Sequence, residues 1–176
     1  MSPGLLRSDD LRAVARKVLE LATRAGATAA DAVVVQHAAF SAGVRLREVE
    51  KLTEARQKRL GLRVFVGERT AVAATADLTR GGLAYFASDA VALARATQPD
   101  PANGLPARDA LATETPDLDL YDDAAATPSP DAALARARAA EAAALESDPR
   151  LTNSEGAEFS QDAATIAYAS TLGFEG

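Results

Sequence analysis

The sequence predicts an α+β fold, in which a mostly antiparallel sheet (a β-meander plus a later hairpin) is packed by about three helices. Three observations support this prediction. Apolar residues recur at helical spacing over residues 9–25. Large aliphatic residues occupy every second position from Leu60 to Val66, and the turn-forming pair Gly67-Glu68 follows. The pair Ser129-Pro130 then opens an alanine-rich segment with the signature of a helix start. A chain of 176 residues is long enough to bury a sizeable core.

The first helix is expected over residues 9–25. Ser8 is the expected N-cap, and Asp9 and Asp10 suit the positive end of the helix dipole. Gly26 fits the position just after the last turn, where a left-handed conformation ends many helices. The helix is therefore predicted to be amphipathic, with an apolar face made by Leu11, Val14, Ala15, Val18, Ala22 and Ala25.

Four consecutive antiparallel strands are expected next. Ser41-Ala42-Gly43 is the expected turn between the first two, and Gly67-Glu68 is the expected type II′ turn between the last two. The four strands are predicted at Asp31–Phe40, Val44–Glu50, Leu60–Val66 and Arg69–Ala76. Strands joined in this order form a meander.

The second half of the chain is expected to hold two more helices and a hairpin. Asp77-Leu78-Thr79 caps a helix over about residues 80–96, and Ser129 with Pro130 begins a helix that runs to about Ser147. The later hairpin is expected from Arg150–Ser160 and Ala163–Ser170, turning at Gln161-Asp162.

Five prolines between these helices indicate a long connector and a boundary. We therefore expect a first domain over residues 1–98, a connector over 99–128 and a further region over 129–176. The last residues, Leu172–Gly176, carry no polar tail, so we expect Gly176 to be an interruption of a longer protein.

Composition excludes several kinds of site. The absence of cysteine excludes disulfides, cysteine-ligated metals and a thiol nucleophile. The single histidine, His37, excludes zinc sites that need two histidines. No apolar run approaches 18 residues and no secretory signal is visible, so a cytoplasmic protein without a membrane span is expected. The positive charges of the first 80 residues are interleaved with glutamates, which argues against nucleic-acid binding.

Few residues suggest chemistry. The carboxylates Asp117, Asp119, Asp122 and Asp123 suit a hard cation, but they lack the glycine and distal glutamate of an EF-hand loop. Leu118 and Leu120 alternate with these acids, so a short strand with one solvated face is the favoured interpretation.

His37, Ser154 and the glycines 61 and 67 have ordinary structural interpretations. His37 is expected to be a strand residue, and Ser154 is expected in a turn or bulge. Gly61 and Gly67 are expected to flank a strand without forming a phosphate loop. The sequence therefore shows no self-contained active site, and no catalytic, cofactor-binding or metal-binding residue is assigned.

Several short sequence segments, taken in the order in which they occur, resemble the N-terminal part of the TldD/PmbA (TldD/TldE) metallopeptidase family, over about residues 9–176. They look more similar to the PmbA (TldE) branch than to the TldD branch. The matching segments are Ala30–Val35, Leu60–Phe65, Ala73–Leu78, Pro99-Asp100-Pro101 with Gly104-Leu105-Pro106, Asp117–Leu120, Pro149–Gly156 and Gly173–Gly176.

This resemblance implies a support or assembly role in a peptidase complex that degrades unfolded peptides or processes peptide precursors. The family's His-Glu-x-x-x-His zinc motif matches no position here. Zinc is therefore expected in a TldD-type partner subunit or in a missing C-terminal part. The expected partners are that subunit and a peptide substrate, with self-association as a further possibility.

Two alternatives stay open: a stand-alone interaction module, and the front part of a catalytic TldD-type peptidase. Within the leading interpretation, Arg45–Glu50 or Leu62–Val66 is a candidate interface or peptide-facing strand, through addition of an extended peptide to a sheet edge.

Overall fold

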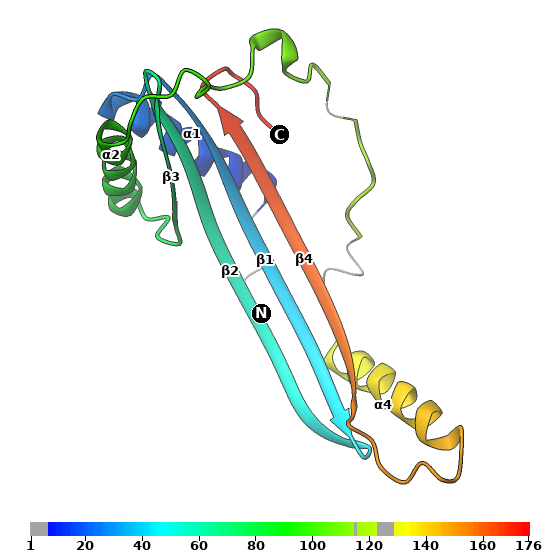
Figure 1. Cartoon of the computed structure of the whole chain (residues 1–176). Helices are drawn as coiled ribbons and strands as arrows, with labels where there is room; N and C mark the ends of the chain where they lie inside the picture. The colour runs from blue at the N-terminus through cyan, green and yellow to red at the C-terminus, as the bar shows by residue number, and fades with distance from the viewer. Residues whose placement is uncertain (1–6, 115, 123–128) are drawn as a thin grey trace. The chain divides into compact units, whose positions relative to one another are not determined.

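The computed structural model describes residues 7–114, 116–122 and 129–176 and confirms the α+β class (Figure 1). The strands pair in the order β3-β2-β1-β4, and the sheet is antiparallel. The elements in chain order are α1 (Ser8–Ala25), β1 (Ala29–Arg45), β2 (Glu48–Val66), β3 (Arg69–Thr75), α2 (Arg80–Ala96), the 3₁₀ turn η1 (Arg108–Ala110), α4 (Pro130–Glu146) and β4 (Ala157–Ser170).

The described residues form two compact units. The first contains residues 7–36, 57–114, 116 and 165–176, and the second contains residues 37–56, 117–122 and 129–164. Strands β1, β2 and β4 each supply residues to both units.

Helix α1 covers the core of the first unit. The predicted apolar face is confirmed, because Leu11, Ala15, Val18 and Ala22 are fully buried. Gly26 ends the helix at φ +106°, as expected. The predicted cap is off by one residue: Ser8 is the first helical residue and Arg7 is the N-cap. The reason is that Asp10 accepts a hydrogen bond from the backbone N–H of Arg7 at 3.3 Å, which caps the chain one residue earlier.

Helix α2 completes this core, and the predicted position of this helix is confirmed. The Thr79 hydroxyl accepts a hydrogen bond from the backbone N–H of Gly82 at 3.1 Å, and Asp77 accepts one from the N–H of Thr79 at 2.9 Å. These caps fix the start of the helix. Its buried residues pack with α1 and with one face of the sheet; that core includes Leu83, Ala87, Ala90, Val91, Ala30, Ala32, Val34, Leu60, Leu62 and Val64.

Helix α4 belongs to the second unit and begins where the sequence predicts. The Ser129 hydroxyl accepts a hydrogen bond from the N–H of Ala132, and Pro130 is the first helical residue. The preceding Thr127-Pro128 lies outside the described residues. Buried Ala133 packs against Phe40 and Ala42 of β1, and small side chains at this contact allow the helix to lie close to the strand.

The predicted turn at Ser41-Ala42-Gly43 is wrong, so the meander has three strands where four were expected. Strand β1 continues through these residues, and the chain reverses at Leu46-Arg47. Lys51–Arg59, which lacks a clear apolar alternation, lies inside β2. The Gly67-Glu68 turn is confirmed: Gly67 has φ +59° and Val66 pairs with Arg69.

The predicted later hairpin is also wrong. Gln161-Asp162 lies in the middle of β4, a single strand from Ala157 to Ser170 beside β1. These polar residues looked like a turn, but Asp162 instead meets His37 of β1 as a surface pair. Residues 150–156 are irregular.

In the described part of the chain, none of the helices combines the length and the hydrophobicity needed to cross a bilayer.

Candidate functional site

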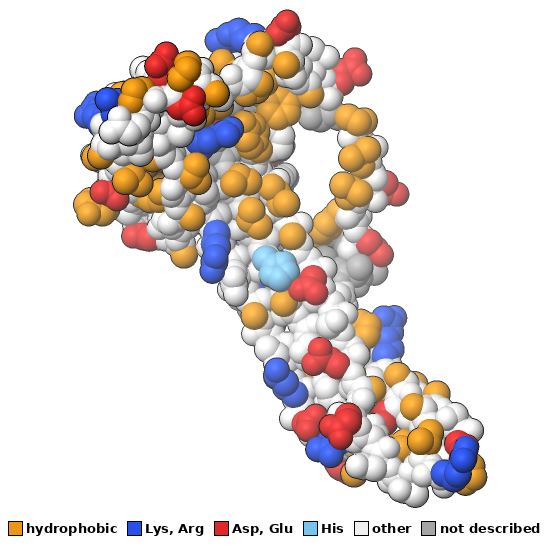
Figure 2. All heavy atoms as spheres, viewed as in Figure 1, with side chains coloured by type: hydrophobic (Ala, Val, Ile, Leu, Met, Phe, Trp, Pro, Cys, Tyr) orange, Lys and Arg blue, Asp and Glu red, His pale blue; other side chains and the backbone are white. Residues whose placement is uncertain are grey.

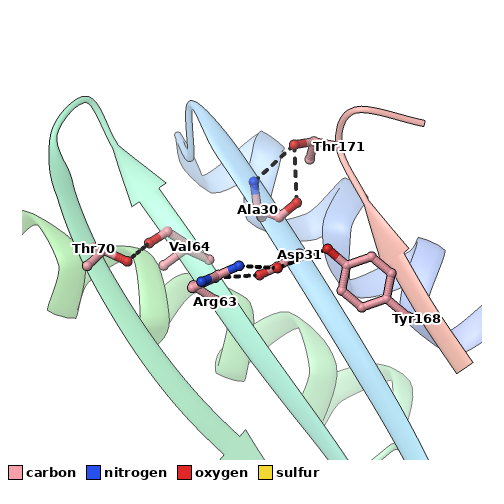
Figure 3. Close-up of polar contacts among 7 residues, drawn as sticks. All are labelled: Ala30, Asp31, Arg63, Val64, Thr70, Tyr168 and Thr171. Carbon is pink, nitrogen blue, oxygen red and sulfur yellow. Dashed lines mark hydrogen bonds and ion pairs between the residues drawn. The ribbon is translucent and has the colours of Figure 1, made fainter. Parts of the chain in front are cut away.

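The first unit carries a polar cluster on the face of its sheet that does not pack against α1 and α2 (Figure 3). It consists of Asp31 from β1, Arg63 from β2 and Tyr168 from β4. Successive side chains of a strand point to opposite faces. The neighbours Ala30, Ala32, Leu62 and Val64 therefore enter the helix-covered core, while Asp31 and Arg63 point the other way.

The three side chains are joined by hydrogen bonds. Arg63 donates from Nε to Oδ1 of Asp31 at 2.9 Å and from Nη2 to Oδ2 at 2.6 Å, which makes a bidentate ion pair. The Tyr168 hydroxyl donates to Oδ2 of Asp31 at 3.0 Å. Asp31 is only 6% exposed, whereas the Arg63 side chain is 44% exposed. A buried carboxylate thus fixes the orientation of two side chains that reach the surface.

The cluster also sets the charges on this face. The hydrogen bond that Arg63 donates to Asp31 holds the pKa of Arg63 above its ordinary value, against the opposing effect of burial. Burial raises the pKa of Tyr168, and the charge of Asp31 and its hydrogen bond add to that effect. At neutral pH the face therefore presents an arginine cation and a neutral phenol, both preorganised by one carboxylate.

A solvent-open groove of ≈ 280 Å³ lies at this cluster. Val33 and Val72 supply apolar surface, and Arg63 and Tyr168 supply the polar part of the lining. Gly61 belongs to the lining as well, and a Cβ there would lie 3.2 Å from Cγ1 of Val33, so glycine allows close packing. An apolar groove with a fixed arginine and a tyrosine is suited to binding a partner surface, because these residue types dominate binding energy at interfaces.

The lone histidine lies elsewhere, in the second unit. Nε2 of His37 is 3.0 Å from Oδ1 of Asp162, and the two side chains are 43% and 61% exposed. Figure 2 shows the single histidine side chain at the molecular surface. This is an exposed cross-strand pair, and His37 lies in a strand as expected.

The aspartate-rich segment forms no strand, so that prediction is wrong for its described residues. Asp119 has φ +49°, and its backbone N–H donates to Oδ1 of Asp117 at 3.0 Å. This local turn replaces the extended backbone that the alternation suggested. Asp123 lies outside the described residues.

No group of three or more metal-ligating side chains is brought together within residues 7–114, 116–122 and 129–176. The described residues therefore bring together no ligand set of the kind a zinc site requires.

Ser154 has the predicted turn role. Its hydroxyl accepts a hydrogen bond from the N–H of Gly156 at 2.8 Å, and its own N–H donates to the Asn153 side chain at 2.9 Å. Gly61 lies in β2 and Gly67 in the β2–β3 turn. Leu62–Val66 pairs with β3 on one side and with β1 on the other, so this segment has no open edge for an added peptide strand.

Sequence reasoning missed Asp31, Arg63 and Tyr168 as a group. A charged residue inside the apolar run 29–35 was a visible signal, because a buried carboxylate needs a partner. The partners themselves lie 32 and 137 residues away.

Comparisons with known proteins agree on the class of domain. Residues 30–94 match the family model described as PmbA/TldA metallopeptidase domain 1. The chain belongs to the TldD/PmbA family and corresponds to the N-terminal region of its members.

Two curated relatives are metalloproteases named PmbA. The chain is 35% identical to the PmbA homolog of Haemophilus influenzae over 98% of its own length and 38% of that protein's. It is 37% identical to PmbA of Escherichia coli O157:H7 over 74% of its length and 28% of that protein's. The chain therefore spans well under half the length of these relatives.

Solved structures share the fold. A Bacteroides thetaiotaomicron protein described as a candidate modulator of DNA gyrase matches 96% of this chain and 38% of its own, with a TM-score of 0.86 and 25% identity. TldE from Thermococcus kodakarensis matches 93% of this chain and 36% of its own, with a TM-score of 0.77 and 15% identity. The second match shows the fold alone.

Proposed function

We propose that this chain is the N-terminal support and assembly part of a PmbA-type subunit in a metallopeptidase complex that cleaves unfolded peptides or peptide precursors. In this proposal the chain contributes no catalytic residue. Residues 1–98 form the family's N-terminal domain, residues 99–128 connect it, and residues 129–176 begin the central region. The complex is a heterodimer with a TldD-type subunit and works in the cytoplasm.

The observation that carries the proposal is the groove at Asp31, Arg63 and Tyr168. It combines apolar walls with polar groups that are already oriented, so binding a partner costs little ordering of side chains. Val72 in this groove and Ile166 of β4 are 70% and 61% exposed. Burying such side chains against a partner would release water from apolar surface.

Zinc belongs, in this proposal, to the partner subunit or to the remainder of the polypeptide. The described residues offer His37 with a single carboxylate, which is fewer ligands than a zinc site requires. The relatives named PmbA favour the PmbA branch over a catalytic TldD-type chain.

The test is to measure binding of the chain to a TldD-type subunit by calorimetry. Val72→Asp places a charge in the groove, and we expect it to weaken binding by about tenfold or more, which corresponds to ~1.4 kcal/mol. Tyr85→Asp is the matched control, because Tyr85 is 76% exposed on α2, away from the groove.

Equal binding by both variants and the wild type would contradict the role of the groove. A chain that binds no TldD-type subunit at all would contradict the assembly role and favour a stand-alone interaction module.

A further inference from the structure

The turn between β1 and β2 has an unusual backbone. Leu46 and Arg47 have φ of +49° and +71°. Among the described residues, positive φ outside glycine occurs at only one other position, Asp119. The left-handed region costs side-chain-bearing residues roughly 1–2 kcal/mol each. Consecutive residues in such a turn point their N–H groups to one side, which forms a concave site for an anion.

A carboxylate from α4 occupies this concave site. Oε1 of Glu141 accepts a hydrogen bond from the N–H of Leu46 at 2.7 Å, and Oε2 accepts one from the N–H of Arg47 at 2.7 Å. Only 2% of Glu141 is exposed. Each carboxylate oxygen therefore has its own backbone donor, in the short geometry of charge-assisted hydrogen bonds.

A third segment of the second unit lies beside the same turn. The guanidinium of Arg45 donates to the Ser154 carbonyl at 3.2 Å, and the Ser154 side chain contributes to the lowered pKa of Glu141. Helix α4, the β1–β2 turn and the Asn153–Gly156 turn therefore meet at Glu141. Nothing in the local sequence of any one of these segments requires the other two.

The other attachments of helix α4 are partly exposed or small. The Arg136 guanidinium lies 5.1 Å from the ring centroid of Phe159, half-buried Leu134 packs beside Ala133, and Glu146 forms an exposed ion pair with Arg47 at 4.0 Å. The other buried residues of the helix are Ala133 and Ala137, whose small side chains bury little apolar area. Arg138 adds one hydrogen bond, from Nε to the Arg47 carbonyl at 3.2 Å. The Glu141 carboxylate is therefore a large share of what holds α4 against the turn.

We infer that the β1–β2 turn is a carboxylate-binding site, that Glu141 is its internal ligand, and that occupancy of the site keeps α4 docked. The chemical class of the ligand is a monocarboxylate that presents two oxygens to two adjacent backbone N–H groups. When the Glu141 side chain is removed, a small carboxylate from solution takes its place.

The experiment compares Glu141→Ala, Glu141→Gln and Glu146→Ala in the whole chain, with sodium acetate as the probe and sodium chloride at equal ionic strength as the reference. Glu146 is the matched control, because it lies on the same helix and its 71% exposed side chain faces the Arg47 guanidinium at 4.0 Å, not the backbone N–H groups of the site. Thermal midpoints report stability, and NMR reports the Leu46 and Arg47 amides.

We expect acetate to raise the midpoint of Glu141→Ala in a saturable way, as a ligand of the folded state does. The amide signals of Leu46 and Arg47 should shift along the same titration. The wild type, Glu141→Gln and Glu146→Ala should not respond, because the site is filled or untouched in each. A response of equal size in all four proteins, or unmoved Leu46 and Arg47 amides, would overturn the inference.

Glu141→Gln keeps the proposal testable if Glu141→Ala does not fold. In this variant we expect the Leu46 and Arg47 amides to exchange with solvent about tenfold faster or more, because a charged acceptor has become neutral. Exchange rates at these two amides equal to those of the wild type would refute the internal-ligand role of Glu141.

Discussion

The carboxylate of Asp31 on β1 accepts two hydrogen bonds from the guanidinium of Arg63 on β2, at 2.9 and 2.6 Å. The pair is asymmetric, since the acid is buried and the base is half exposed. The pair therefore holds Arg63 in one orientation at the groove, and removing one partner leaves the other without its counterion.

Asp31→Asn keeps the size of the side chain and removes its charge. We expect the variant to lose about 2 kcal/mol of unfolding free energy, because a charge-assisted bidentate contact becomes a weaker one. Chemical denaturation measures this loss. Glu68→Gln is a suitable control, since Glu68 is an exposed acid of the β2–β3 turn in the same unit. Equal stability of Asp31→Asn and the wild type would contradict the structural importance of the pair.

Tyr168→Phe removes the hydroxyl that donates to Asp31. At neutral pH we expect a loss of about 1 kcal/mol, the usual contribution of one hydrogen bond. Fluorescence-monitored unfolding of the two proteins checks this value. A loss close to zero would indicate that water replaces the hydroxyl without cost.

The same tyrosine should make stability depend on alkaline pH. The pKa of Tyr168 is raised above 10.0 in the folded chain, mainly by burial, so the fold favours the neutral phenol. Its contribution is complete below the unfolded pKa of about 10 and is lost as the pH rises through the folded pKa. The difference in ultraviolet absorbance between wild type and Tyr168→Phe gives the titration. An ionisation at or below the ordinary tyrosine value would contradict the burial argument.

Glu141 should make stability depend on acid pH. The hydrogen bond from the N–H of Arg47 lowers its pKa below 4.5, with help from Leu46 and Ser154 and against burial. The contribution of the carboxylate is present above the unfolded pKa and is lost as the pH falls through the lower, folded value. Wild type should therefore lose more stability on acidification than Glu141→Gln. Parallel acid-unfolding curves would show that Glu141 carries no charge-dependent contribution.

Gly156→Ala tests the close contact between two segments of the second unit. Gly156 has φ +103°, and a Cβ there would lie 2.6 Å from the carbonyl oxygen of Val44. We expect a loss of about 1–3 kcal/mol, the range for a strained backbone residue. Gly104→Ala is the control, because a Cβ at Gly104 meets nothing within 4 Å. Similar stability of both variants would mean that the Asn153–Gly156 turn moves freely away from β1.

The helices could be predicted from the sequence because their ends are set by neighbouring residues. Thr79, Ser129 and Gly26 act on the turn beside them, and each marks its helix terminus to within a residue. The strand ends were predicted less well. Leu46-Arg47 contains no glycine or asparagine, and its N–H groups are satisfied by a carboxylate 95 and 94 residues away.

The candidate site depends on such distant pairings. Asp31 was visible as a charge within an apolar run, but its contact with Tyr168 joins positions 137 residues apart. The polar pair Gln161-Asp162 was mistaken for a turn because a solvated strand face and a loop have similar compositions. Local patterns determine the helix ends here, and contacts between distant segments determine the strand ends and the site.

The place of β4 in the sheet affects the order in which the chain can fold during its synthesis. Strand β1 pairs with a segment that leaves the ribosome more than a hundred residues later: Thr171 exchanges hydrogen bonds with Ala30 across 141 residues. Until β4 emerges, one edge of β1 stays unpaired and Asp31 lacks its contact with Tyr168. A nascent chain stalled before residue 157 would thus expose a bare strand edge, the kind of surface that chaperones protect from aggregation.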